Sequence, residues 1–132
     1  LILASYHGIP KKYFDKGDPY HCYCQKTSRL ISEKFNSLEI KTTFQSRFGP
    51  QEWLQPYTDK TLENLPKEGI KNVLAICPGF SSDCVETLEE IAIQGKESFL
   101  KSGGTNFDVI ACLNDNEDHI QMMEKIVRGY LR

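Results

Sequence analysis

Four short apolar runs alternate with segments of helical periodicity along the chain. The runs are LILASY, IKTTF, NVLAIC and FDVIAC, at residues 1–6, 40–44, 72–77 and 107–112. Each run is short and is bounded by turn residues, which is typical of a buried strand. Strands that alternate with helices favour a parallel sheet with helices on both faces. The pattern therefore predicts an α/β fold built on an open four-stranded parallel sheet.

The segments between and after these runs predict the helices. Apolar residues recur at helical spacing in residues 21–36, 59–69, 83–104 and 115–132. In the third segment, an α-helical period places one apolar face at Val85, Leu88, Ala92 and Phe99. In the last segment, the apolar stripe consists of Ile120, Met123, Ile126 and Val127. The longest irregular segment, residues 46–58, is long enough to be a functional loop.

Composition narrows the function classes. The chain has 132 residues and a net charge of -2, which indicates a single domain without the basic excess that recruits nucleic acid. Its longest apolar run is far below the ~18 residues that a membrane span needs. An odd set of 5 cysteines at irregular spacing favours a reducing compartment over a disulfide framework. Because the sequence begins inside an expected strand without Met, we expect a fragment of a longer protein.

Polar side chains follow the expected strands. His7 follows the first run, the triplet Gln45, Ser46 and Arg47 follows the second, Asp83 lies a few residues beyond the third, and Asn114 follows the fourth. Ligands of open parallel sheets bind beyond the carboxyl ends of the strands, so these groups predict a polar site at one edge. A histidine there can accept a proton or bind a metal. It can equally be a histidine that a backbone partner satisfies.

A row of carboxylates is the second candidate feature. Asp83, Glu86 and Glu90 are spaced i, i+3 and i+7, which aligns them on one face of an α-helix, and Glu97 extends the row. Acids at a helix start serve as caps and complement the helix dipole, which explains Asp83 and Glu86. A path for a divalent cation or for protons would explain the whole row, and the residues alone do not decide.

Two further segments have alternative interpretations. In the loop at residues 46–58, Trp53 could stack on a flat ligand while Arg47 pairs with an anion, or the tryptophan could pin the loop to the domain. The HCYC segment at residues 21–24 lacks the second ligand pair of a zinc site, so we interpret it as a first helical turn.

Three motifs resemble the carboxyl-terminal half of the ferrochelatases, which insert ferrous iron into protoporphyrin IX to form protohaem in the last step of haem biosynthesis. They are SYHGIPKKYFDKGDPY, TFQSRFGPQEWLQPYTDKTLE and CPGFSSDCVETLEEI, and the resemblance runs through the whole chain. The resemblance implies that the full-length protein is a lyase, specifically a metal chelatase. It also implies that this chain has the chelatase-like, Rossmann-type fold of one half of that enzyme. It also implies that residues 1–132 form the carboxyl-terminal domain, in which residues 115–132 form a final helix against the absent amino-terminal half.

The resemblance also implies roles for individual residues. His7 and Glu86 correspond to the catalytic pair, and His7, Glu86, Asp83 and Glu90 to metal-binding groups. The residues that correspond to the porphyrin-binding positions of the family are Trp53, Gln45, Ser46 and Arg47. Many members carry histidine where this chain has Cys84, which puts a metal-ligand role at that position in doubt.

The resemblance implies partners and a location as well. We expect protoporphyrin IX and Fe²⁺ as substrates, no further cofactor, and no iron–sulfur cluster, because the chain ends without the cysteine-rich tail of some members. We expect the isolated fragment to be inactive, and the last helix to fold onto its own sheet or to pair with a second copy. The expected location is the cytoplasm, with peripheral attachment to the inner membrane as an alternative. A non-catalytic metal- or tetrapyrrole-binding module and a cobalt chelatase are the alternative functions.

Overall fold

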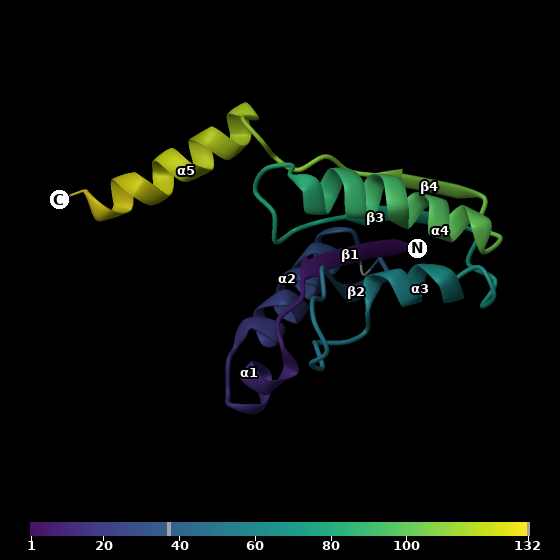
Figure 1. Cartoon of the computed structure of the whole chain (residues 1–132). Helices are drawn as coiled ribbons and strands as arrows, with labels where there is room; N and C mark the ends of the chain where they lie inside the picture. The colour runs from purple at the N-terminus through teal and green to yellow at the C-terminus, as the bar shows by residue number, and fades with distance from the viewer. Residues whose placement is uncertain (37, 132) are drawn as a thin grey trace.

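A computed structural model describes residues 1–36 and 38–131 and contains the expected parallel sheet. The strands are β1 (Ile2–His7), β2 (Ile40–Gln45), β3 (Asn72–Ile76) and β4 (Asn106–Val109). The helices are α1 (Lys11–Asp15), α2 (Tyr20–Lys34), α3 (Thr58–Asn64), the π-helix η1 (Glu86–Gly95), α4 (Lys96–Lys101) and α5 (Glu117–Tyr130). All neighbouring strands pair in parallel, in the order β2-β1-β3-β4 (Figure 1). The predicted fold class is confirmed.

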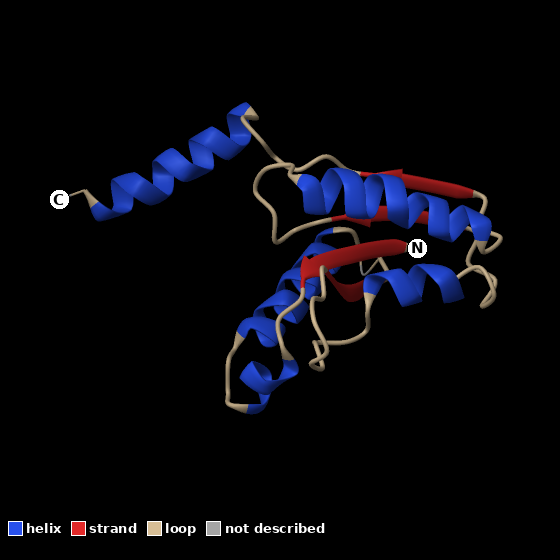
Figure 2. Ribbon diagram, in the orientation of Figure 1, coloured by secondary structure: helices blue, strands red, loops and turns tan. Residues whose placement is uncertain are grey.

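Helices cover both faces of this sheet (Figure 2). On one face, α3, η1 and α4 bury a cluster that includes Leu62, Ile91 and Phe99. On the other face, α2 contributes Cys24 to a second cluster around Phe44. Burial of these side chains on either side of the strands provides the main stabilisation of the domain.

The register of the central strand sets where the strands end. β1 pairs with β2 along its whole length, from Ile2 opposite Ile40 to His7 opposite Gln45. Its pairing with β3 covers only Ile2 to Ala4. The carboxyl end of β1 therefore projects beyond its ladder with β3, and His7 lies at the sheet edge where the connecting loops gather.

The helix after β3 differs from the expected α-helix. Its buried residues are Thr87, Ile91, Gly95 and Phe99, at a constant spacing of four. Val85 and Leu88, which an α-helical period assigns to the buried face, are 68% and 54% exposed. The assignment of these two residues was wrong because the turns of η1 are π-type, with hydrogen bonds that span five residues and a longer period.

The last helix lies away from the sheet. Asn116 caps α5 by accepting a hydrogen bond from the Asp118 backbone N–H at 2.9 Å. The helix then extends away from the domain (Figure 1), and its apolar stripe is solvent-exposed. The expectation that it folds onto its own sheet was therefore wrong, because α5 points outward from its first turn. Pairing with a second copy stays a prediction, and the expected helix end at residue 132 lies outside the described residues.

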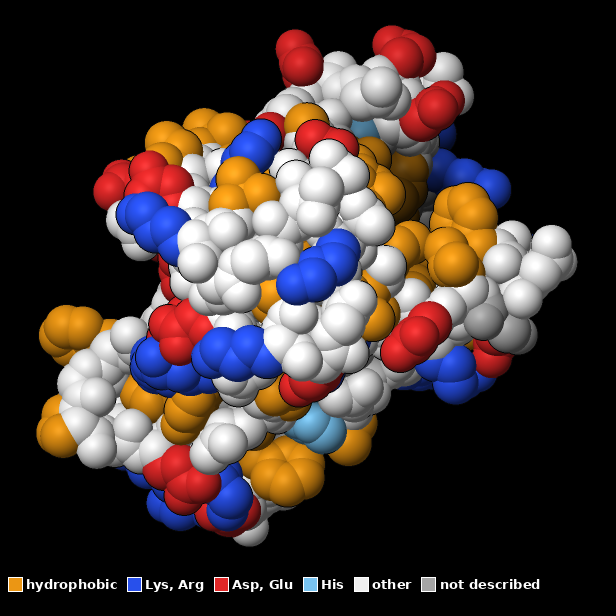
Figure 3. All heavy atoms as spheres, turned by 90° about the vertical axis from the view of Figure 1, so that its right-hand side faces the viewer, with side chains coloured by type: hydrophobic (Ala, Val, Ile, Leu, Met, Phe, Trp, Pro, Cys, Tyr) orange, Lys and Arg blue, Asp and Glu red, His pale blue; other side chains and the backbone are white. Residues whose placement is uncertain are grey.

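The surface agrees with the balanced composition. Basic and acidic side chains are interspersed over the face that Figure 3 shows, with small apolar areas between them. Within residues 1–36 and 38–131, no helix combines the length and apolar character that crossing a membrane requires.

Gly104 provides a test of core packing. A Cβ atom at this position would lie 2.2 Å from Cε1 of Phe99, whose side chain is fully buried. Because the ring has no free space to move into, Gly104→Ala should lower the free energy of unfolding by about 1–3 kcal/mol. Urea denaturation followed by circular dichroism measures the change.

Gly129→Ala is the matched control. A Cβ atom there meets no other atom within 4 Å, and the residue lies in the exposed helix α5. Alanine favours a helix interior over glycine by about 0.5–1 kcal/mol, so this variant should be neutral or stabilised. Equal stability of the two variants would contradict the described packing of Phe99 against Gly104.

Candidate active site at the carboxyl edge of the sheet

His7 is exposed at the end of β1, and its ring orientation follows from one contact. Its Nδ1 lies 2.6 Å from the carbonyl oxygen of Gly8. A carbonyl oxygen only accepts hydrogen bonds, so in the neutral ring Nδ1 carries the proton. Nε2 is then the nitrogen with a free lone pair. The ring of Phe80 lies beside it, with a centroid distance of 6.4 Å. His7 can therefore accept a proton at Nε2.

Glu86, the first residue of η1, lies within electrostatic reach of His7. A hydrogen bond from the Cys84 thiol, a backbone hydrogen bond of its own and the charge of His7 lower the pKa of the Glu86 carboxyl. The carboxylate is thus ionised near neutral pH. The two predicted catalytic residues, at the end of β1 and the start of η1, therefore lie within electrostatic reach of each other, where one can take up a proton and the other attracts a cation.

Asp83 ties the start of η1 to the loop after β4. Its carboxylate accepts hydrogen bonds from Nδ2 of Asn114 at 2.8 Å, from Oγ1 of Thr87 at 3.0 Å and from the backbone N–H of Cys112 at 3.3 Å. These bonds, led by that of Asn114, lower the pKa of Asp83. The helix N-cap is Val85, without a side-chain cap, so the expected role of Asp83 as the cap was wrong. Asp83 thus precedes η1, and the carboxylates on the helix itself begin at Glu86.

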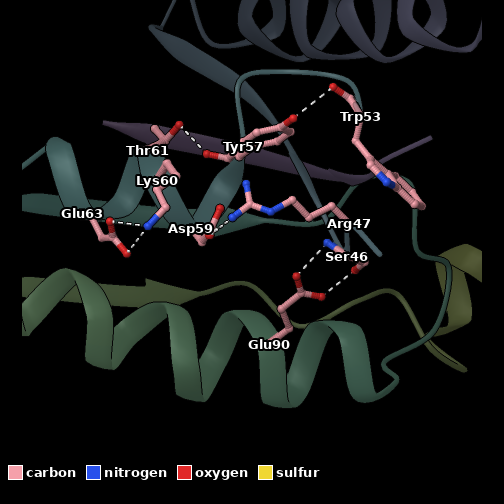
Figure 4. Close-up of polar contacts among 9 residues, drawn as sticks. All are labelled: Ser46, Arg47, Trp53, Tyr57, Asp59, Lys60, Thr61, Glu63 and Glu90. Atoms are coloured by element: carbon pink, nitrogen blue, oxygen red, sulfur yellow. Dashed lines mark hydrogen bonds and ion pairs between the residues drawn. The ribbon is translucent and has the colours of Figure 1, made fainter. Parts of the chain in front are cut away.

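Glu90 joins η1 to the end of β2. Its carboxylate accepts hydrogen bonds from the backbone N–H of Ser46 at 2.7 Å and from its hydroxyl at 2.5 Å, as Figure 4 shows. Nε2 of Gln45 donates to the same carboxylate at 3.2 Å and to the backbone oxygen of Glu86 at 2.7 Å. Ser46 has a φ of +61°, which aims its N–H at the helix. Gln45 and Ser46 thus position Glu86 and Glu90 of η1.

Arg47 is engaged with its own loop. Its guanidinium lies over the ring of Tyr57, 4.2 Å from the centroid, and pairs with Asp59 at 2.7 Å (Figure 4). The pair is exposed, so it contributes little to stability. A cavity of about 310 Å³ lies between α3 and η1, with Arg47 and Glu90 in its wall. Arg47 was expected to pair with an anion, and its partner in the structure is the carboxylate of Asp59.

Trp53 pins the loop onto the domain. It is 9% exposed, and its Nε1 donates to the Phe48 carbonyl at 2.9 Å. A Cβ atom at Gly8 would lie 3.2 Å from its Cε3, so the indole packs against the residue that follows His7. Of the two interpretations of this loop, the packing agrees with the pinned one. Phe48, in contrast, is 82% exposed.

The cysteines provide no preformed metal centre. Cys22 is exposed and Cys24 is buried, and α2 begins at Tyr20, so the HCYC segment is the expected first helical turn. Across the part of the chain that the structure describes, no cluster of three or more His, Cys, Asp or Glu side chains could hold a metal ion.

Comparison with known proteins identifies the family. The family model described as Ferrochelatase matches residues 1–131. The chain belongs to the ferrochelatase family. Ferrochelatases from Rhizobium johnstonii and Rhizobium meliloti are 57% and 58% identical to it, over 100% and 99% of the chain, and one from Pseudoalteromonas atlantica is 54% identical over 98%. The chain spans only 39%, 39% and 37% of the length of these relatives.

A solved structure supports the fold of this ferrochelatase family member. The crystal structure of a protein from Marinobacter aquaeolei, titled as a CbiX protein of cobalamin (vitamin B12) biosynthesis, aligns with a TM-score of 0.60. The alignment covers 98% of this chain and 95% of the other at 12% identity. At that identity the likeness concerns the fold alone.

Two residues of the site, Tyr20 and Thr87, have no counterpart in the prediction from the sequence. Tyr20 donates its hydroxyl to the His7 carbonyl at 2.8 Å, and Thr87 donates to Asp83. Asn114, expected at this edge because it follows the fourth run, donates to Asp83 as well. Tyr20 stands in the first quoted motif, in a sequence, DPY, that is typical of a helix start, but nothing in the letters indicates its partner.

Removal of Glu90 should weaken the joint between β2 and η1. Glu90→Ala leaves the Ser46 N–H and the Gln45 amide without their carboxylate acceptor. Because unsatisfied buried donors cost about 1–3 kcal/mol, the free energy of unfolding should fall by that amount in urea denaturation. Glu89→Ala is the control, since Glu89 is exposed and, among the described residues, its side chain bonds only Gln94. Equal effects of the two variants would contradict the joint.

The lowered pKa of Asp83 predicts a pH dependence of stability. The folded-state pKa lies below the ordinary value of 3.8, so the contribution is present above about pH 4 and is lost as pH falls through the lowered pKa. Asp83→Asn should therefore destabilise the chain at pH 7 and make its unfolding free energy less sensitive to acid. Urea titrations at neutral and acid pH measure both. A variant with the same acid dependence as the unchanged chain would refute the assignment.

Proposed function

We propose that the full-length protein inserts ferrous iron into protoporphyrin IX to form protohaem, and that this chain is its carboxyl-terminal half. The match of residues 1–131 to the ferrochelatase family carries the proposal. The approach of His7 and Glu86 at one sheet edge supports it, since a base and an anionic group together suit the reaction. Relatives of which the chain covers only 39% support the existence of a further part.

The proposed chemistry begins with removal of protons. The macrocycle carries two pyrrole N–H groups, which must be deprotonated before its four nitrogens can bind iron. Nε2 of His7 accepts one of these protons, and the Gly8 carbonyl stabilises the protonated ring through Nδ1, while the second proton passes to solvent. Glu86, ionised because its pKa is lowered, attracts the cationic substrate and balances the charge of the ring.

Asp83 and Glu90 have a conditional role in this proposal. Each would contact iron only after giving up hydrogen bonds that now occupy its carboxylate. We therefore assign the first iron contact to His7 and Glu86, and cation transfer to the other two only in a rearranged site. Gln45 and Ser46 serve the porphyrin site by holding Glu90.

The remaining expectations concern partners and location. We propose that the apolar stripe of α5 packs against the amino-terminal half, which would bury side chains that are now exposed. We propose that Trp53 and Arg47 form the wall of the porphyrin site, that no cluster binds this chain, and that the isolated chain is inactive. Bacterial relatives support a cytoplasmic location for the full-length protein.

His7→Ala in the full-length protein tests the proposed base. Loss of a positioned general base should lower kcat about 10²–10⁴-fold, measured by the absorbance of haem formed from Fe²⁺ and protoporphyrin IX. His21→Gln is the control, because this histidine lies on α2 and stacks on Phe44 of β2, with ring centroids 5.6 Å apart. Retention of turnover by His7→Ala would remove His7 from the mechanism.

The same assay separates the alternatives. Binding of Fe²⁺ or porphyrin without haem formation by the unchanged protein would favour a binding module over an enzyme. Turnover with Co²⁺ but not with Fe²⁺ would favour a cobalt chelatase. Glu86→Gln removes the charge but keeps the shape, so iron insertion should fall while porphyrin binding, followed by fluorescence, is retained.

A further inference from the structure

The peptide unit between His7 and Gly8 is held from two sides. Its N–H, on Gly8, donates at 2.8 Å to the carbonyl of Gln45, which is the last paired residue of β2. Its carbonyl, on His7, accepts the hydroxyl of Tyr20 at 2.8 Å. Both polar atoms of this one peptide plane are therefore paired, one with the sheet and one with α2.

Tyr20 takes the place of a missing strand partner. The ladder between β1 and β3 covers only Ile2 to Ala4, so the His7 carbonyl lies beyond it. Tyr20 is positioned by its own backbone N–H, which donates to Oδ1 of Asp18 at 2.9 Å, and by packing against the core cluster around Tyr6. Burial raises the pKa of its hydroxyl, which keeps the proton in place for donation.

The orientation of this peptide plane matters for the histidine ring. The carbonyl that faces Nδ1 belongs to Gly8 and lies in the next peptide unit, between Gly8 and Ile9. A rotation about the Cα–C bond of His7 would turn the His7–Gly8 peptide and carry Gly8, with its carbonyl, away from Nδ1. The ring would then lose the contact that places its proton on Nδ1 and leaves Nε2 free.

We propose that Tyr20 is a positioning residue, whose hydroxyl fixes the His7–Gly8 peptide and thereby selects the ring tautomer in which Nε2 of His7 accepts the proton. The inference deepens the proposed function and rests on it, since it assigns His7 as the base. Tyr20 acts through its hydrogen bond to the His7 carbonyl and takes up no proton itself.

Tyr20→Phe in the full-length protein is the test, because it removes the hydroxyl and keeps the packed ring. Tyr6→Phe is a matched control, since it also removes one buried hydroxyl bond, from Tyr6 to Ser28 at 3.0 Å, away from the His7 peptide. Tyr20→Phe should lower kcat for haem formation about tenfold with little change in the KM for porphyrin, and Tyr6→Phe should change kcat by less than about twofold.

A second readout reports on the ring itself. Proton–nitrogen NMR of protein with labelled histidine distinguishes the two imidazole tautomers. We expect the Nδ1–H form of His7 in the unchanged protein and in Tyr6→Phe, and a mixture of both forms in Tyr20→Phe. Equal kcat and equal His7 spectra for the two variants would overturn the proposal.

Further comparisons separate failure of this inference from other failures. Thermal melting shows whether either variant is unfolded. If Tyr20→Phe is unfolded, Asp18→Ala replaces it, because this change removes the hydrogen bond that holds the Tyr20 backbone. Asp18→Ala should then shift the His7 tautomer in the same direction, to a smaller degree. An unchanged His7 spectrum in that variant would count against the proposal. If His7→Ala retains turnover, the proposed base is wrong, while the spectra still test the role of Tyr20.

Discussion

The parallel pairing of β1 with β2 is the constraint on which the site depends. It runs to the last residue of β1 and continues as the bond from the Gly8 N–H to the Gln45 carbonyl. One residue further, Ser46 turns its N–H toward Glu90. The same register therefore places the histidine on one strand end and the anchor of η1 on the next, and a shift by one residue would reverse both side chains.

Much of this arrangement is predictable because strands and their ends have strong local signals. The run LILASY indicated β1 by its buried apolar residues, and parallel topology then required His7 and the residues after Gln45 to share an edge. The pair of His7 and Glu86 came from the resemblance of the motifs rather than from spacing. The hydrogen bonds between Ser46 and Glu90 could not be predicted, because they depend on a positive φ at Ser46. A serine in the sequence does not indicate that backbone conformation.

The failures share a physical origin in tertiary context. An α-helical period predicted that Val85 and Leu88 are buried. The helix instead has wider π-type turns, which place Ile91 and Gly95 on the buried face. The apolar stripe of α5 predicted a buried helix but not its direction, since a stripe does not specify what covers it. The bond from Tyr20 to His7 joins residues that are 13 positions apart, on elements whose approach only the fold determines.

The central claim is that His7 presents a free Nε2 to the macrocycle at the carboxyl edge of the sheet, within electrostatic reach of an ionised Glu86. A crystal structure of the full-length protein with metal-free protoporphyrin IX tests it most directly. The account predicts the macrocycle at this edge, with Nε2 of His7 facing the pyrrole nitrogens and Nδ1 still bonded to the Gly8 carbonyl. A macrocycle bound at the opposite edge of the sheet, or a His7 ring turned away from it, would contradict the account.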